Sequence, residues 1–203
     1  MRRQTEAPKL PVEVLPEFFR NESEAMIKTE RLILRPWKAE DFEPFAKMNA
    51  DPRVMEYFLS TLTKEESDAR AKIFSDEINE LGFGFWAVGI PHVADFIGMV
   101  GLRTVPAGFS HFSPTIEIGW RLAFEFWGQG YATEAAIAAL RFGFDKLQFN
   151  EIVAFTAASN KRSQSVMQKI GMHHNKNDDF DHPGLSQGHP LCPHVLYRST
   201  RHN

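Results

Sequence analysis

Residues 127–134 read Trp-Gly-Gln-Gly-Tyr-Ala-Thr-Glu, and this short segment constrains the fold more than any other part of the chain. It follows an alternating, strand-like run at 115–122 and precedes an alanine-rich run that predicts a helix to about Lys146. A glycine-rich turn that leads into a helix leaves the first backbone N–H groups of that helix without partners. These donors and the positive end of the helix dipole suit a phosphate or pyrophosphate. The segment therefore predicts a strand–turn–helix unit that binds an anion.

Two common nucleotide-binding motifs do not fit this turn. The dinucleotide fingerprint G-x-G-x-x-G fails because Thr133 stands where its third glycine belongs. The P-loop fails because no Gly-Lys-Ser/Thr follows. A glycine pair can also serve only to close a tight corner between a strand and a helix. The turn thus indicates a phosphate-type site outside both folds, or a simple corner.

The rest of the chain reads as strands and helices in a mixed order. The run at 115–122 places Ile116, Ile118, Trp120 and Leu122 on one face and Glu117, Gly119 and Arg121 on the other. Several consecutive strands followed by helix–strand alternation favour an α+β fold with a mixed sheet. We expect strands at 31–35, 83–90, 96–102, 115–122, 151–157 and 194–199, and helices at 39–49, 64–81, up to 146 and from 160 to 171.

Composition limits the class of protein. The 203 residues are 43% hydrophobic and 24% charged, which is typical of a soluble globular domain. A net charge of -3 gives no basis for nucleic-acid binding. Cys192 is the only cysteine, and the chain has no apolar stretch long enough to cross a membrane, so we expect a cytoplasmic location. Residues 1–26 contain three prolines without periodicity and read as an N-terminal arm.

Four segments in order resemble the GNAT superfamily of N-acetyltransferases, and within it the Rim-type branch, which acts on ribosomal-protein N-termini. The resemblance covers roughly residues 28–200 and includes the opening run 29–36. It implies an acetyltransferase domain at 27–203, built on a mostly antiparallel mixed sheet of about seven strands with helices on both faces. The segments are Glu117-Ile118-Gly119-Trp120, Trp127–Ala135, Asn160-Lys161-Arg162-Ser163 and Lys169-Ile170-Gly171-Met172.

The resemblance implies acetyl-CoA as the co-substrate and a set of residues that bind it. The superfamily signature has Gln or Arg where this chain has Trp127, so we expect the phosphates to be held by backbone N–H groups. The pantetheine arm is expected to pair with the backbone of Trp120, Arg121 and Leu122. Asn160 is expected to bind the arm from the other side, although an asparagine here is equally explained as a helix cap. The remaining expected contacts are Gly128, Gln129, Gly130, Tyr131, Ala132, Thr133, Arg162 and Ser163.

Acetyl transfer needs a neutral amine, and the resemblance implies one side chain that removes a proton from the amine and another that protonates the leaving sulfur. Glu117 is the expected general base, directly or through a water molecule, because α-amines and lysines are mostly protonated at neutral pH. It is alternatively a plain strand carboxylate beside Arg121. Ser163 is the first choice for protonating the leaving sulfur and Tyr197 is the second. A hydroxyl at the position of Ser163 is also explained by the start of a helix.

The C-terminal segment is rich in histidine and aspartate, but the spacings match no standard zinc pattern, so we expect no metal. We expect Phe180-Asp181-His182-Pro183 to form part of a loop over the acceptor site, and Cys192 to be structural.

The sequence thus predicts an N-acetyltransferase that joins acetyl-CoA and an amine in a ternary complex. The acceptor is a primary amine of a protein N-terminus or a small molecule such as a polyamine or an amino sugar, and the protein is a monomer or a homodimer. One alternative is a module that binds acetyl-CoA without catalysis. Another is a protein-interaction domain whose glycine turn is only a corner.

Overall fold

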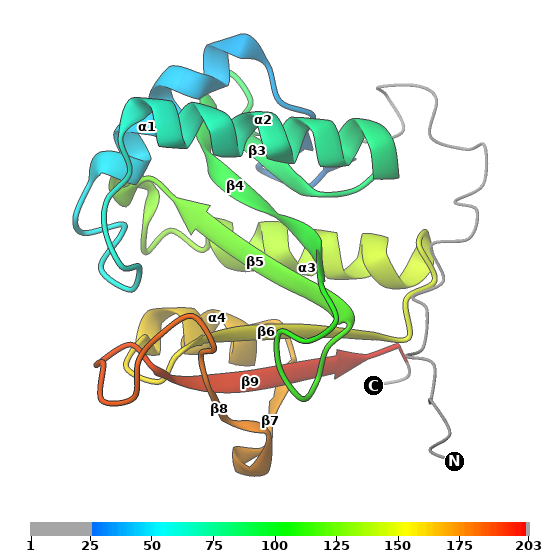
Figure 1. Cartoon of the computed structure of the whole chain (residues 1–203). Helices are drawn as coiled ribbons and strands as arrows, with labels where there is room; N and C mark the ends of the chain where they lie inside the picture. The colour runs from blue at the N-terminus through cyan, green and yellow to red at the C-terminus, as the bar shows by residue number, and fades with distance from the viewer. Residues whose placement is uncertain (1–25, 202–203) are drawn as a thin grey trace.

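The computed structural model describes residues 26–201, which form one mixed sheet with helices on both faces (Figure 1). The predicted arm at 1–26 lies outside this range except for its last residue. The α-helices of the described part are α1 (Phe42–Ala50), α2 (Lys64–Leu81), α3 (Tyr131–Asp145) and α4 (Lys161–Lys169). Short 3-10 turns occupy Ala39–Asp41, Phe124–Phe126 and Lys176–Asp178.

The strands follow the order β1-β2-β3-β4-β5-β6-β9-β7, with β8 also paired to β9. Every neighbouring pair is antiparallel except β5 and β6, which run parallel. The expected mixed, mostly antiparallel sheet is confirmed, and short two-residue strands raise its size to nine strands. The strands are β1 (Ile27–Lys28), β2 (Ile33–Arg35), β3 (Phe85–Ile90), β4 (Ala94–Val105), β5 (Thr115–Leu122), β6 (Glu151–Ala157), β7 (His173–His174), β8 (Phe180–Asp181) and β9 (Pro193–Thr200).

Local sequence explains where the elements begin and end. Thr63 caps α2 by accepting a hydrogen bond from the Glu66 amide, and the Glu66 carboxylate accepts one from the Thr63 amide in return. Gly82 ends the helix in the left-handed conformation, with φ 74°. Asn160 caps α4 in the same way as Thr63 caps α2, as predicted, because its side-chain oxygen accepts from the Ser163 amide.

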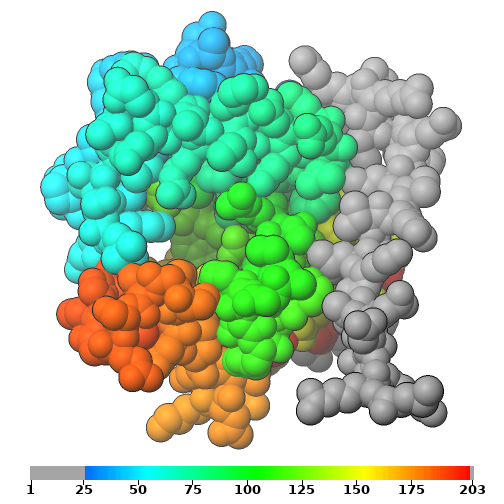
Figure 2. All heavy atoms as spheres, in the orientation of Figure 1, coloured from blue at the N-terminus to red at the C-terminus, as the bar shows by residue number. Residues whose placement is uncertain are grey.

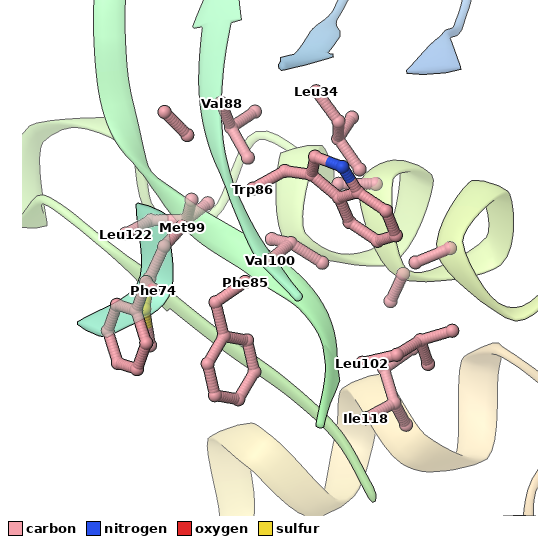
Figure 3. Packing of buried hydrophobic residues seen from close by; sticks show 14 of the residues in the cluster. Leu34, Phe74, Phe85, Trp86, Val88, Met99, Val100, Leu102, Ile118 and Leu122 are labelled. Atoms are coloured by element: carbon pink, nitrogen blue, oxygen red, sulfur yellow. The ribbon is translucent and has the colours of Figure 1, made fainter. Parts of the chain in front are cut away.

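Adjacent residues of β3 show how the two helical layers are held. The ring of Phe85 packs against Phe74 of α2, with centroids 5.1 Å apart, whereas the ring of Trp86 packs against Phe142 of α3 at 5.3 Å. Neighbouring side chains of a strand point to opposite faces, so α2 and α3 cover opposite faces of the sheet. Figure 3 shows Phe85 and Trp86 pointing away from each other into the two halves of the core.

Candidate functional site

The turn before α3 presents a row of unused backbone donors. Gly128 and Gly130 have φ of 75° and 83°, a conformation that glycine adopts without strain. The first bond of the helix runs from the Glu134 amide to the Gly130 carbonyl, 3.0 Å. The N–H groups of residues 128–133 have no acceptor anywhere in the described chain 26–201. Exposed glycines, free amides and a helix N-terminus together fit the diphosphate of a nucleotide such as CoA.

Trp127 fixes the start of this turn. Its indole Nε1 donates to the Leu122 carbonyl at 2.8 Å, which ties the turn to the end of β5. The guanidinium carbon of Arg162 lies 4.8 Å from the centre of the Trp127 ring. Arg162 also forms an ion pair with Glu56, in the segment between α1 and α2. Arg162 therefore lies beside the turn, and its charge is paired with a carboxylate.

An arginine that the sequence analysis did not single out supports the same turn. Arg31 donates through Nη1 to the Gln129 carbonyl at 3.0 Å and through Nε to Glu134 at 2.6 Å. Thr29 donates to the same carboxylate at 2.6 Å. Partial burial favours a higher pKa for Glu134, but these hydrogen bonds outweigh it and hold the pKa below its ordinary value. The only signal in the sequence was the run 29–36, which the resemblance included without assigning a role to Arg31.

The sheet opens next to the turn. Strands β5 and β6 share a single registered pair, Glu117 opposite Val153. Beyond that pair β5 continues through Trp120 to Leu122 along β4 alone, so its edge toward β6 has no strand partner. Free backbone groups along a strand edge accept an extended chain as an additional strand. The edge at Trp120–Leu122 is therefore available where the sequence predicted the pantetheine arm.

Glu117 lies at the point where β5 and β6 begin to separate. It faces Arg103, its partner across β4 and β5, and Glu77 of α2. Burial raises the pKa of Glu117 from 4.5 to about 7; Arg103 lowers it and the negative charge of Glu77 raises it further. Arg103 is itself bound to Glu77, with 3.0 Å between nitrogen and oxygen. A carboxyl group with a pKa near neutrality is suited to accept a proton at physiological pH.

Asn160 and Ser163 lie at the start of α4, across the opening from β5. Besides capping the helix, the Asn160 amide nitrogen donates to the Thr156 hydroxyl at 3.0 Å. The Ser163 hydroxyl makes no hydrogen bond with any residue from 26 to 201, so it is free to donate to a ligand. Asn160 is thus engaged within the protein on both of its side-chain atoms, whereas Ser163 is not.

Tyr197 is not brought together with Glu117. It is only 3% exposed, its ring stacks on His174 at 5.0 Å, and Gln168 of α4 donates to its hydroxyl at 3.3 Å. Its registered partner is Ala154, which follows Val153, the partner of Glu117. Alternation along β6 therefore places Tyr197 on the α4 face and Glu117 on the α2 face.

The α2 face carries a hollow bounded by three segments. Figure 2 shows it between the cyan residues after α1, the orange residues that precede β9, and green residues of the central strands. β8 and the residue after it pack on the β4–β5 loop through aromatic rings, with Phe112 and Phe180 5.0 Å apart and Phe109 and His182 5.4 Å apart. Burial lowers the pKa of His182 and of His194, whose rings lie 4.9 Å apart. The rings of Phe180 and His182 therefore give this side of the hollow an aromatic character.

Between residues 26 and 201, no group of three or more His, Cys, Asp or Glu side chains is arranged to hold a metal ion. Cys192 is buried and its pKa is raised by that burial. No helix in the described part of the chain is long and apolar enough to cross a membrane.

Comparisons with known proteins agree with this geometry. The family model described as the acetyltransferase (GNAT) domain matches residues 31–173. Uncharacterized protein YkkB of Bacillus subtilis is 34% identical over 151 residues, which cover 73% of this chain and 85% of that protein. The FsC-acetyl coenzyme A-N(2)-transacetylase of Aspergillus fumigatus is 32% identical over 186 residues, covering 86% of this chain and 76% of that protein.

Two further comparisons extend the similarity. YdaF of Bacillus subtilis, named as a candidate ribosomal N-acetyltransferase, is 28% identical over 83 residues, 41% of this chain and 43% of that protein. The crystal structure of a GNAT-family acetyltransferase from Bacillus anthracis superposes with a TM-score of 0.73 at 24% identity, covering 88% of this chain and 99% of that one.

Proposed function

This chain belongs to the GNAT acetyltransferase family and is an acyltransferase, and we propose that it transfers an acetyl group from acetyl-CoA to a primary amine, on a protein N-terminus or a small molecule. The observation that carries the proposal is the row of free N–H groups at 128–133 beside the unpaired edge of β5. These two features offer a diphosphate site and an extended-chain site side by side, as CoA requires. The printed name of the Aspergillus fumigatus relative also includes acetyl coenzyme A.

Bound acetyl-CoA supplies the acetyl group as a thioester. The residues 128–133 hold the diphosphate through their amides, and the backbone of Trp120, Arg121 and Leu122 pairs with the pantetheine arm. Asn160 and Arg162 border the arm from α4. The Asn160 side chain caps the helix through one oxygen lone pair and binds Thr156 through one N–H, so its second N–H can donate to the arm while both bonds are kept.

Glu117 removes the proton from the acceptor ammonium, directly or through a water molecule. The amine nitrogen then attacks the acetyl carbonyl carbon and the carbon–sulfur bond breaks. The first proton of the ammonium remains with Glu117 or passes to solvent, and the second, lost from the nitrogen after the attack, goes to the leaving thiolate. The Ser163 hydroxyl, free of internal partners, donates a hydrogen bond to the leaving sulfur. Tyr197 is the second candidate for that donor, and its burial against His174 and Gln168 makes Ser163 the better one.

Release of free thiol from acetyl-CoA, measured with a panel of polyamines, amino acids and short peptides, tests the proposal. We expect acetyl-CoA to raise the melting temperature while NAD does not, and at least one amine class to release thiol. Stabilisation by acetyl-CoA without thiol release from any amine would favour a non-catalytic CoA-binding module. No stabilisation by acetyl-CoA would favour a protein-interaction domain.

A further inference from the structure

Arg121 is a buried cation whose hydrogen-bonding capacity is mostly unused. It is 9% exposed, and its Nη1 donates to the Asn49 side-chain oxygen at 2.6 Å. Its Nε is buried and has no hydrogen-bond partner among residues 26–201. No carboxylate of residues 26–201 forms an ion pair with it. Buried arginines are normally paired, and an unpaired charge in such a place is costly.

The surroundings of Arg121 add positive charge and no negative charge. Asn49 is neutral, and its side-chain nitrogen donates a hydrogen bond to the Ser67 hydroxyl at 2.8 Å. Burial lowers the pKa of Arg121 to about 10, and the charge of Arg70 on α2 lowers it further. Arg70 forms no ion pair with any residue of the described chain. Two cations therefore lie near each other with no anion between them.

The free edge of the guanidinium has the shape that a carboxylate requires. Nη1 is used by Asn49, which leaves Nε–H and the N–H groups of Nη2, a parallel pair of donors, without partners. Such a pair binds the two oxygens of a carboxylate. The Phe58 ring covers the group, with its centre 4.1 Å from the guanidinium carbon. Phe58 is 44% exposed, so its side chain can rotate into solvent and uncover this face of the guanidinium.

Arg121 also faces the acceptor side of the sheet. It lies four residues after Glu117 on β5 and shares its face, so their α-carbons are about 13 Å apart. That face is the one covered by α2, where the hollow of Figure 2 lies. An amine placed at Glu117 would direct the far end of its molecule along β5 toward Arg121.

We propose that Arg121 binds a carboxylate of the acceptor, so that the substrate carries a primary amine at one end and a carboxylate several bonds away. This inference rests on the proposed acetyl transfer for the location of the amine. The carboxylate belongs either to a free amino acid of suitable length or to an acidic residue of a peptide, and both present the same chemistry to Arg121.

Calorimetric titration in the presence of CoA, which cannot react, tests the inference without turnover. The ligands are 4-aminobutanoate, 6-aminohexanoate and 8-aminooctanoate, each beside its primary amide, and the dipeptide amides Ala-Asp and Ala-Asn. We expect at least one acid to bind the wild-type protein about tenfold or more tighter than its amide. Preference within the amino-acid series or within the dipeptide pair identifies the source of the carboxylate.

Variants separate anion binding from support of the fold. Arg121→Gln is expected to bring the acid-to-amide ratio near one while the affinity for the amide stays unchanged. Arg121→Lys keeps the charge and is expected to retain part of the preference for the acid over its amide. It replaces Arg121→Gln as the test variant if Arg121→Gln does not fold. Arg141→Gln, at an exposed position of α3, retains all of it. A ratio near one in the wild-type protein for every pair, or a preference that persists in Arg121→Gln, would overturn the inference.

Thiol release with the same compounds keeps the two proposals distinct. Acids that bind through Arg121 without being acetylated contradict the proposed transfer and leave the anion site supported. Acetylation of acids and amides at equal efficiency supports the transfer and contradicts the anion site.

Discussion

Arg35 and Arg121 are equally buried, each 9% exposed, yet they are partnered in opposite ways. Arg35 donates to both oxygens of Asp41 at 2.7 Å and also to the Pro36 and Asp95 carbonyls. The hydrogen bonds from Arg35 to Asp41 raise its pKa above the ordinary value, whereas burial lowers the pKa of Arg121. One arginine has four internal hydrogen bonds, two of them to a carboxylate, and the other has one to a neutral amide.

The contrast extends to the carboxylates of the two regions. Asp41 accepts from Arg35 and from the Lys38 amide, and so joins β2 to the turn before α1. The Glu117 carboxylate makes no hydrogen bond with any residue from 26 to 201, and its neighbour Arg103 is bound to Glu77. The paired groups join two elements of the fold, and the incompletely paired groups on the α2 face of β5 are the ones that we propose act on substrates.

Asp41→Ala removes the partner of Arg35 and gives the largest expected effect. It would leave Arg35 in the same unpaired state as Arg121, and we expect a loss of about 3 to 5 kcal/mol in the free energy of unfolding. Urea denaturation measures it. The double variant Arg35→Met, Asp41→Leu, which removes both charges, should recover much of the loss. A loss below about 1 kcal/mol in the single variant would show that the two arginines do not differ as described.

Glu117→Gln tests the carboxylate side of the comparison through activity. Removal of the proton acceptor should lower kcat/KM on the order of 10²-fold at neutral pH. The wild-type rate should rise with pH through about 7, and the variant should lose this step. Glu80→Gln, on an exposed turn of α2, is the matched control and should leave kcat/KM and its pH dependence unchanged. An identical pH–rate profile in wild type and Glu117→Gln would exclude Glu117 as the base.

The raised pKa of Glu117 also predicts how stability depends on pH. The folded state holds the proton more tightly than the unfolded state, so the contribution is complete below about 4.5 and is lost as pH rises through about 7. The loss amounts to at most about 3 kcal/mol over this range. The free energy of unfolding, measured for wild type and Glu117→Gln across this pH window, should fall with pH in the wild type. It should fall less steeply in the variant. Equal slopes would contradict the assigned burial.

Asn49→Asp converts the Arg121 region into a copy of the Arg35 pair. A carboxylate at this fully buried position would accept from Arg121 and Ser67, and we expect about 1 kcal/mol of stabilisation. The new carboxylate would also raise the pKa of Arg121 toward its ordinary value. Asn49→Ala, which removes the acceptor, should destabilise instead. If both variants destabilise equally by chemical denaturation, Arg121 has no unmet need for an anion.

The strand, turn and helix of the proposed acetyl-CoA site followed from the sequence because they are local. Strand, turn and helix are contiguous at 115–146, and the observed strands β5 and β6 have the predicted bounds. Capping by Asn160 was likewise readable from its neighbours. Alternation, glycine and a cap residue act over a few positions, so one sequence is enough to reveal them.

The side-chain environment was not predictable because it depends on contacts between distant elements. Arg121 was named for its backbone and as a neighbour of Glu117, and nothing in the sequence indicates that its guanidinium meets Asn49, 72 positions earlier. Arg162 was expected to contact acetyl-CoA, and its pairing with Glu56 was not foreseen. Tyr197 was placed near the thioester, but strand register turns it to the α4 face. Register and long-range pairing are set by the whole fold.

The bond network of Arg31 has a practical consequence for anyone who trims this protein. Thr29 and Arg31 precede the first long elements of the domain, yet they anchor Glu134 and the Gln129 carbonyl more than 90 positions later. The family match begins at residue 31, so a truncation drawn at that boundary would discard Thr29 and free the end of the chain next to the turn. A fragment that is meant to keep the proposed CoA site intact must therefore start upstream of Thr29, so that the hydrogen bond from Thr29 to Glu134 is retained.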